Sequence, residues 1–169
     1  LKDYTSNKVF KKNKLSAVDI HYIEDQHNFN WKLRDSISII NGYKCNMATL
    51  DYSGRSFTVW FTSEIPIPDG PFKFKGLPGL IVKMDDSDRD YSIKLSGFEK
   101  SNFLMLLSSF QESRLKSKLK FYKSLDNYYD NPILALEADG QVFSPEVRKL
   151  FKEKYKDKFK YLGKNRVER

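Results

Sequence analysis

The stretch that decides the fold is Gly76-Leu77-Pro78-Gly79-Leu80-Ile81, in which two glycines enclose a Leu-Pro pair. Proline fixes its own φ angle, and glycine allows backbone turns and close approaches that a β-carbon blocks. The hexapeptide therefore predicts a rigid corner in front of a strand that begins at Leu80. We expect this corner to direct Phe72, Phe74 and Leu77 into a sheet.

The segment before the corner has the two-residue period of a β-strand. From residue 57 to residue 62, apolar side chains alternate with Thr58, Trp60 and Thr62. Large side chains on both faces are typical of a central strand, or of a strand that lines an apolar concavity. Further extended runs are predicted at residues 8–22, 31–39, 44–52, 80–84 and 91–95, and residues 103–107 are predicted to form a strand or a short helix.

Two helices are predicted towards the C-terminal end. Residues 116–129 carry apolar side chains at helical spacing, and this helix is expected to stop before Asn131-Pro132. The second helix begins at Ser144-Pro145-Glu146, with a hydroxyl N-cap, a proline and an acid in the first turn, and ends at Gly163. These patterns together predict an α+β fold in a single domain over residues 1–169. The expected architecture is a curved antiparallel β-sheet with C-terminal helices, and a half-barrel is one form that such a sheet can take.

The net charge of +8 is concentrated in one segment. Residues 144–169 contain ten Lys/Arg and four Asp/Glu, which leaves only +2 for residues 1–143. This distribution favours a basic terminal helix over a general polyanion-binding surface. The apolar stripe of the helix fits docking on the sheet, and contact of its basic side with a membrane surface is the alternative.

Metal and thiol chemistry have weak support in the sequence. Cys45 is the one cysteine, so the chain contains no intrachain disulfide, and we expect this residue to be a small buried hydrophobe. The run Asp86-Ser87-Asp88-Arg89-Asp90 has the acid spacing that opens a calcium loop, but Tyr91 stands where that loop requires glycine. A solvated hairpin tip is therefore predicted, and no cofactor or metal is expected.

The order of motifs between residues 42 and 81 resembles the GLPGLI family, which is named for the hexapeptide. The motifs are Gly42-Tyr43-Lys44-Cys45, Gly54-Arg55, Trp60-Phe61-Thr62, Glu64-Ile65-Pro66-Ile67, Gly70-Pro71-Phe72-Lys73-Phe74 and the hexapeptide itself. Asn131-Pro132-Ile133 is similar to a further element of that family. The resemblance implies an exported cell-envelope protein, found mainly in Bacteroidetes, in the periplasm or at the outer membrane. It also implies a leader peptide and first strands upstream of Leu1.

We expect a non-catalytic binding or accessory module that engages a peptide, a lipid, or a periplasmic or outer-membrane protein. The candidate binding residues lie on the aromatic strand and the corner: Trp60, Phe72, Phe74, Gly76, Leu77, Pro78 and Gly79. Two alternatives are a hydrolase that uses carboxylates near Glu64 and a polyanion binder that uses the basic C-terminal helix. Polyanion binding would weaken steeply with rising salt, whereas binding of an apolar partner would not. No specific nucleic-acid partner is expected.

Overall fold

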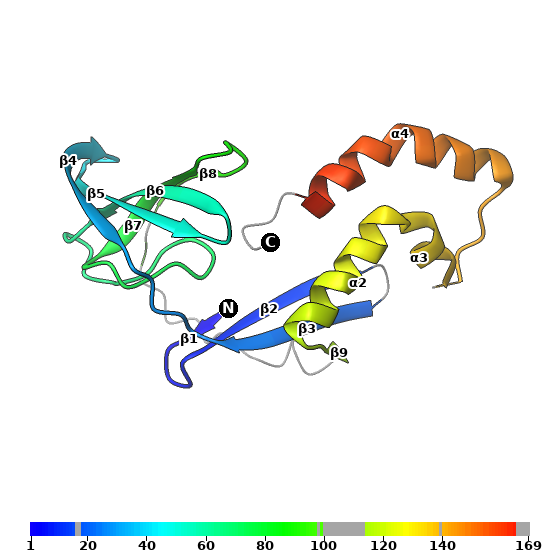
Figure 1. Ribbon diagram of the computed structural model, residues 1–169, viewed down its shortest axis with the longest axis horizontal. Coiled ribbons are helices and arrows are strands. Elements are labelled where there is room, and N and C mark those ends of the chain that lie inside the picture. Colours follow the sequence, from blue (N-terminus) through cyan, green and yellow to red (C-terminus); the bar gives the residue numbers. More distant parts are fainter. Residues whose placement is uncertain (16–17, 98, 100–113, 139, 165–169) are drawn as a thin grey trace. The chain divides into compact units, whose positions relative to one another are not determined.

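The computed structural model describes residues 1–15, 18–97, 99, 114–138 and 140–164 (Figure 1). The chain divides into two compact units. Unit 1 comprises Leu1–Asp25 and Leu104–Arg166, and unit 2 comprises Gln26–Phe103 and Val167–Arg169. Each unit is described by itself below. The single domain predicted from length and composition stays a prediction.

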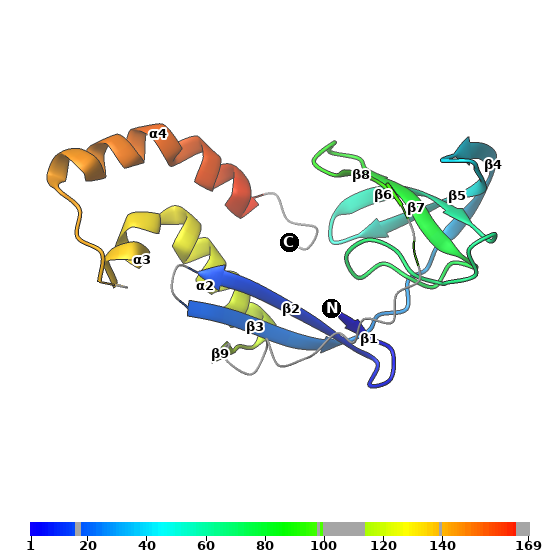
Figure 2. The same ribbon diagram turned by 180° about the vertical axis from the view of Figure 1, so that it is seen from behind.

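Unit 2 contains a five-stranded antiparallel sheet in the order β4-β5-β6-β7-β8. Figures 1 and 2, which view the chain from opposite sides, show these strands as a gently curved, open sheet. Sequential neighbours pair throughout, which gives the predicted meander. The strands are β4 (Lys32–Ile40), β5 (Tyr43–Tyr52), β6 (Arg55–Thr62), β7 (Leu80–Asp86) and β8 (Ser92–Lys94).

The central strand β6 is covered on both faces, as its sequence predicts. On one face, Phe57, Val59 and Phe61 are buried in the main core of the unit. On the other face, Trp60 packs on a smaller cluster that contains Cys45. The main core consists of Ala48, Leu50, Phe57, Val59, Phe61, Phe74, Leu77, Ile81 and Met84.

The hexapeptide forms the predicted corner between β6 and β7. Gly79 has φ +142°, and a β-carbon at this position would lie 2.0 Å from the carbonyl oxygen of Thr62. Only glycine allows the chain to pass so close to the end of β6 in that conformation. The amide of Leu80 then donates to the carbonyl oxygen of Ile65 at 3.1 Å, and β7 begins at Leu80, which confirms the predicted start.

The corner directs two of the three expected side chains inwards. Phe74 is fully buried and Leu77 is 3% exposed, and both belong to the main core. The prediction was wrong for Phe72, which is 48% exposed. This residue has φ +53°, a left-handed conformation that is uncommon outside glycine, and its ring packs edge-on against Tyr91.

Unit 1 contains a second sheet in the order β1-β2-β3-β9, with β9 parallel to β3. Its strands are β1 (Lys2–Asp3), β2 (Lys8–Leu15), β3 (Val18–Asp25) and β9 (Arg114–Leu115). The helix α2 (Lys118–Asp130) packs on this sheet, because Tyr22 and Ile20 of β3 form one core cluster with Phe121 and Leu125.

The other helices of unit 1 are α3 (Pro132–Ala138) and α4 (Pro145–Lys164). The predicted N-cap of α4 is confirmed, since the Ser144 hydroxyl accepts from the amide of Val147 at 3.3 Å. Helix α4 packs against α2 and α3, whereas docking on the sheet was expected. Its sequence could not decide this point, because an apolar stripe fits a helix surface as well as a sheet.

The α+β class with antiparallel sheets and C-terminal helices is confirmed. The strands are divided between two sheets, because residues 26–31 are not in a strand and separate β3 from β4. Among the described strands, β4 and β8 end the sheet of unit 2 without pairing to each other, so this sheet is open. The segment 103–107, predicted as a strand or a short helix, lies outside the described residues.

Candidate functional site

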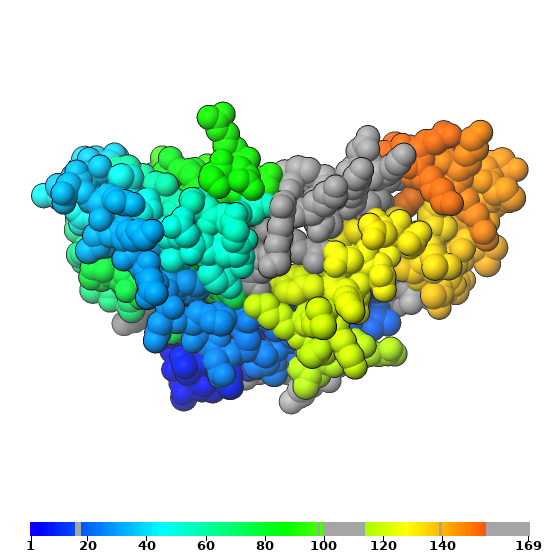
Figure 3. All heavy atoms as spheres, viewed as in Figure 1, coloured from blue at the N-terminus to red at the C-terminus, as the bar shows by residue number. Residues whose placement is uncertain are grey.

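The edge strand β4 presents three aliphatic side chains to solvent. Leu33, Ile37 and Ile39 are 64%, 63% and 67% exposed. Strand β4 stands at the end of its sheet and, in the part of the chain that the structure describes, pairs with β5 alone. In the space-filling view of Figure 3, the light-blue segment that contains β4 lies at the surface. We call Leu33, Ile37 and Ile39 the β4 shelf.

A bulge keeps the three side chains of the β4 shelf on one face. Leu33 pairs with Ala48, Ile37 with Asn46 and Ile39 with Lys44. The register shifts between Arg34 and Ile37, so β4 contains two extra residues at that point. Since the β5 partners are spaced by two, all three shelf residues point to the face that carries Ala48.

The β4 shelf therefore continues the apolar face of the main core. Phe74 and Leu77 from the corner cover that face over the inner strands, and Phe29 and Trp31 pack beside them. Trp31 is held there by a hydrogen bond from its Nε1 to the carbonyl oxygen of Lys75 at 2.9 Å. These side chains do not extend over β4. The β4 shelf is therefore the part of the core face that stays exposed to solvent.

Basic side chains lie near the β4 shelf on both faces of the sheet. Lys32 forms an exposed ion pair with Asp51 at 3.1 Å, and Arg34 donates from Nε to the Thr49 hydroxyl at 3.1 Å. Lys44, opposite Ile39, is also exposed. Lys32 and Arg34 pair with Thr49 and Met47, so their side chains lie on the face opposite the shelf, whereas Lys44 lies on the shelf face. The positive charge of Lys44 favours a partner with acidic residues beside its apolar ones.

The predicted binding residues are distributed over different surroundings. Phe74 and Leu77 are core residues, and Gly79 is buried against the backbone of Thr62. Trp60 is half-buried on the opposite face of the sheet. Phe72, Gly76 and Pro78 are exposed around the corner. The structure therefore does not bring the seven residues together as one surface, and a binding role for them stays a prediction.

The carboxylates near the corner are bonded to backbone amides. Glu64 accepts from the amide of Lys44 at 2.8 Å through Oε1, and Asp69 accepts from the amide of Gly70 at 2.7 Å through Oδ1. The contact of Glu64 ties the segment after β6 to β5, whereas the contact of Asp69 is local, with the next residue in the chain. The hydrolase alternative near Glu64 stays a prediction with no additional support from this geometry.

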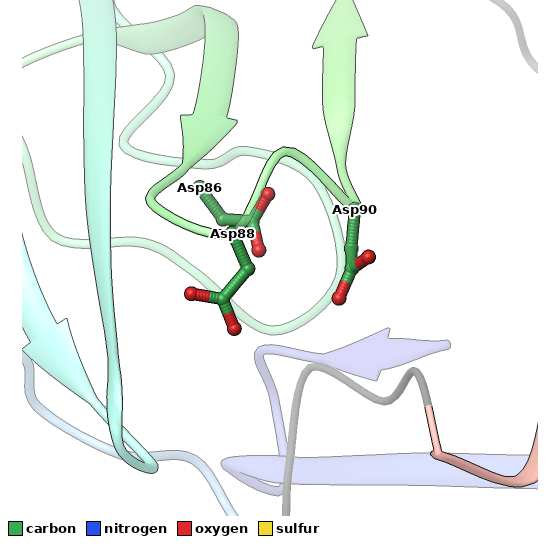
Figure 4. A group of neighbouring side chains, drawn as sticks. All are labelled: Asp86, Asp88 and Asp90. Carbon is green, nitrogen blue, oxygen red and sulfur yellow. The ribbon is translucent and has the colours of Figure 1, made fainter. Parts of the chain in front are cut away.

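The acidic hairpin tip is organised around an arginine. Asp86, Asp88 and Asp90 bring their carboxylate groups together at the β7–β8 turn (Figure 4). Nη1 of Arg55 lies 2.5, 3.3 and 2.8 Å from oxygens of these three residues in turn. Burial alone would lower the pKa of Arg55, but hydrogen bonds to Asp90 and Asp86 raise it above its ordinary value. The guanidinium thus supplies the cation on which these carboxylates converge.

The pair of Arg55 and Asp86 is a buried structural tie. The Arg55 side chain is 1% exposed and that of Asp86 is fully buried. The second oxygen of Asp86 accepts from the amide of Tyr91 at 2.8 Å, and the Tyr91 ring lies 5.7 Å from the guanidinium carbon. The network fixes the start of β6 to the turn after β7. Sequence reasoning treated the acids as a local tip and missed Arg55, which is distant from them in the chain.

The lone thiol is a packing residue. Cys45 is fully buried, as predicted, beside Ile40 and Val82. Burial raises the pKa of the Cys45 thiol, which favours its neutral and unreactive form.

The basic helix α4 exposes apolar as well as charged side chains. Val147 is 44% and Leu150 is 62% exposed, and Arg148 forms an ion pair with Glu137 at 2.8 Å. None of the described helices combines the length and hydropathy that crossing a membrane requires. Contact of α4 with a membrane surface or a polyanion stays a prediction.

Comparisons with known proteins found similarity to a family model and to solved structures. The model of a family described as "Protein of unknown function (Porph_ging)" matches residues 51–83, from the end of β5 through the corner into β7. Among curated proteins, none matches the chain significantly.

Two crystal structures of PNGF-II, in space groups C2 and P21, are similar to this chain. Each has 18% sequence identity and a TM-score of 0.55, and each match covers 70% of this chain. At this identity the likeness concerns the fold alone. The chain spans 23% and 22% of the length of the two PNGF-II chains.

Proposed function

We propose that this chain is a non-catalytic binding module that holds an extended segment of a protein partner against the β4 shelf. The observation that carries the proposal is the row of three aliphatic side chains, 63% to 67% exposed, on an edge strand. Single exposed apolar residues are ordinary, but an exposed apolar row on a sheet edge promotes association and is usually avoided. Its presence here favours a partner.

Burial of the β4 shelf supplies a driving force for association. Covering one exposed Ile or Leu side chain stabilises a complex by about 1.5–3 kcal/mol at most. Because the shelf continues the core face, a partner would extend an existing apolar layer. Lys44, which lies opposite Ile39 on the shelf face, adds a preference for acidic residues beside the apolar ones.

A non-catalytic role is supported by the hydrogen bonds and ion pairs that the carboxylate groups of unit 2 form. Glu64 and Asp69 accept from backbone amides, and the three acids of the hairpin tip converge on Arg55. These groups contribute to the stability of the unit, and none of them belongs to β4.

We also propose that the chain is exported to the periplasm or the outer membrane as a GLPGLI-family protein. Two findings support this: the order of motifs from residue 42 to residue 81, and the family match over residues 51–83, which contains the hexapeptide. Fractionation of cells that express the full-length gene tests the location, and recovery in the cytosolic fraction would contradict it.

Selection of a random-peptide library displayed on phage tests the binding role. We expect the wild-type chain to enrich peptides with apolar residues at alternate positions. The variant Ile39→Lys should lose these peptides, because it places a charge within the apolar contact. At 67% exposure the substitution leaves the fold nearly unaffected.

Ile67→Lys is the matched control, since Ile67 is a 40% exposed aliphatic residue beside the corner. It should retain the selected peptides. The proposal is contradicted if wild type and Ile39→Lys enrich the same peptides, or if nothing is enriched. Loss of binding in Ile67→Lys alone would move the binding surface to the corner.

A further inference from the structure

We infer that the partner segment binds by adding a strand to the sheet of unit 2, through the backbone of Ile37 and Ile39. This inference rests on the proposed function and deepens it. The proposed function requires apolar contact with the β4 shelf, whereas strand addition also requires main-chain hydrogen bonds.

The turn between β4 and β5 determines which backbone groups of β4 face outwards. Asn41 and Gly42 have φ +53° and +85°, and Ile40 pairs with Tyr43, so this is a two-residue hairpin with both turn residues left-handed. In such a hairpin the residues that flank the turn exchange both hydrogen bonds, and bonded and non-bonded pairs then alternate along the ladder.

Ile40 and Ser38 are therefore the residues of β4 that bond to β5 in this region. Ile37 and Ile39 occupy the intervening non-bonded pairs with Asn46 and Lys44. Their N–H and C=O groups point away from β5, towards the open edge of the sheet. The same two residues thus offer both the exposed aliphatic side chains and the outward backbone donors and acceptors.

The two halves of β4 differ in how they are protected against pairing. The first half contains the charged residues Lys32 and Arg34 and the bulge at residues 35–36. Charges and bulges on an edge strand prevent other strands from pairing with it. The second half, from Ile37 to Ile40, carries no charge and no bulge. An added strand is therefore confined to this second half.

The chemistry of the edge specifies the ligand class. Side chains directly opposite each other in adjacent strands lie on the same face. The partner residues opposite Ile37 and Ile39 must therefore be apolar, two positions apart, and the chain between them extended. Because Lys44 lies opposite Ile39 on the same face, the partner is a short extended peptide with an alternating apolar pair and a neighbouring acid.

Backbone methylation of a selected peptide tests the inference. One synthetic version carries N-methyl groups on the alternate residues that face Ile37 and Ile39, and a second carries them on the other alternate residues. In an antiparallel addition only the first version blocks amides that bond to β4, and in a parallel addition only the second version does. We expect the version with blocked amides to bind about tenfold more weakly, or worse, and the other version to bind like the parent peptide.

Strand addition is refuted if the two methylated peptides bind equally well. In that case the proposed function survives as long as Ile39→Lys still abolishes binding, so the two failures are distinguishable. Sedimentation of the chain alone tests a second copy as occupant. A dimer that dissociates in the Ile39→Lys variant would overturn the assignment to a peptide partner.

Discussion

Replacement of Gly79 by alanine should destabilise unit 2 far more than the same change at Gly76. At Gly79, φ of +142° lies in a region that is nearly exclusive to glycine, and occupying it costs about 1–3 kcal/mol. The added β-carbon would also lie 2.0 Å from the carbonyl oxygen of Thr62, and the shift that relieves this overlap costs about 1–3 kcal/mol more. The expected loss is about 2–6 kcal/mol.

Gly76 provides the matched control within the same hexapeptide. Its φ is +93°, but a β-carbon there would meet no atom within 4 Å. The loss is then limited to backbone strain of about 1–2 kcal/mol. Because small domains are stable by about 5–15 kcal/mol, Gly79→Ala removes a large fraction of this stability.

Urea unfolding followed by tryptophan fluorescence measures both variants. Trp31 and Trp60 are the two tryptophans of the chain, and both belong to unit 2, so the signal reports this unit. Before urea is added, the Gly76→Ala variant should have the same fluorescence as wild type, and it serves as the reference for Gly79→Ala. The reasoning about the corner is refuted if Gly79→Ala unfolds at the same urea concentration as Gly76→Ala.

Two further predictions concern single ties in each unit. Arg55→Ala should lower the free energy of unfolding by about 3–5 kcal/mol, because it leaves the buried Asp86 without its cation. Lys32→Ala should lower it by less than about 1 kcal/mol, since the ion pair of Lys32 is exposed. Equal urea midpoints of the two variants would contradict this prediction. Ser117→Ala should cost about 0.5–1 kcal/mol in unit 1, because the N-cap bond of α2 is lost. A thermal midpoint by circular dichroism identical to that of wild type would exclude a role for the cap.

The local elements of this fold could be predicted from the sequence because their signals are local. Alternation from residue 57 to residue 62 gave a strand with two covered faces, and the Ser144-Pro145 pair marked the start of α4. The hexapeptide predicted both a corner and the first residue of β7. Each of these depends on a few neighbouring residues and on backbone sterics.

The candidate site depends on contacts that no local pattern contains. Ile37 and Ile39 were predicted to lie in a strand, but their exposure follows from the edge position of β4, which is a property of the strand order. Arg55 lies close to Asp86 because β6 pairs with β7. The side chain of Phe72 points outwards because Phe72 itself has a left-handed backbone conformation. Nothing in the sequence indicates this conformation, since the residue is not glycine.

Residue-resolved amide exchange in the presence of a selected peptide tests strand addition most directly. In the unbound chain, the amide hydrogens of Ile37 and Ile39 should exchange quickly, and those of Ser38 and Ile40 slowly, because the latter bond to β5. Peptide binding should then slow exchange at Ile37 and Ile39 and leave Ser38 and Ile40 unchanged. Slow exchange at Ile37 and Ile39 before the peptide is added, or protection that appears only around residues 72–79, would contradict a partner strand on β4.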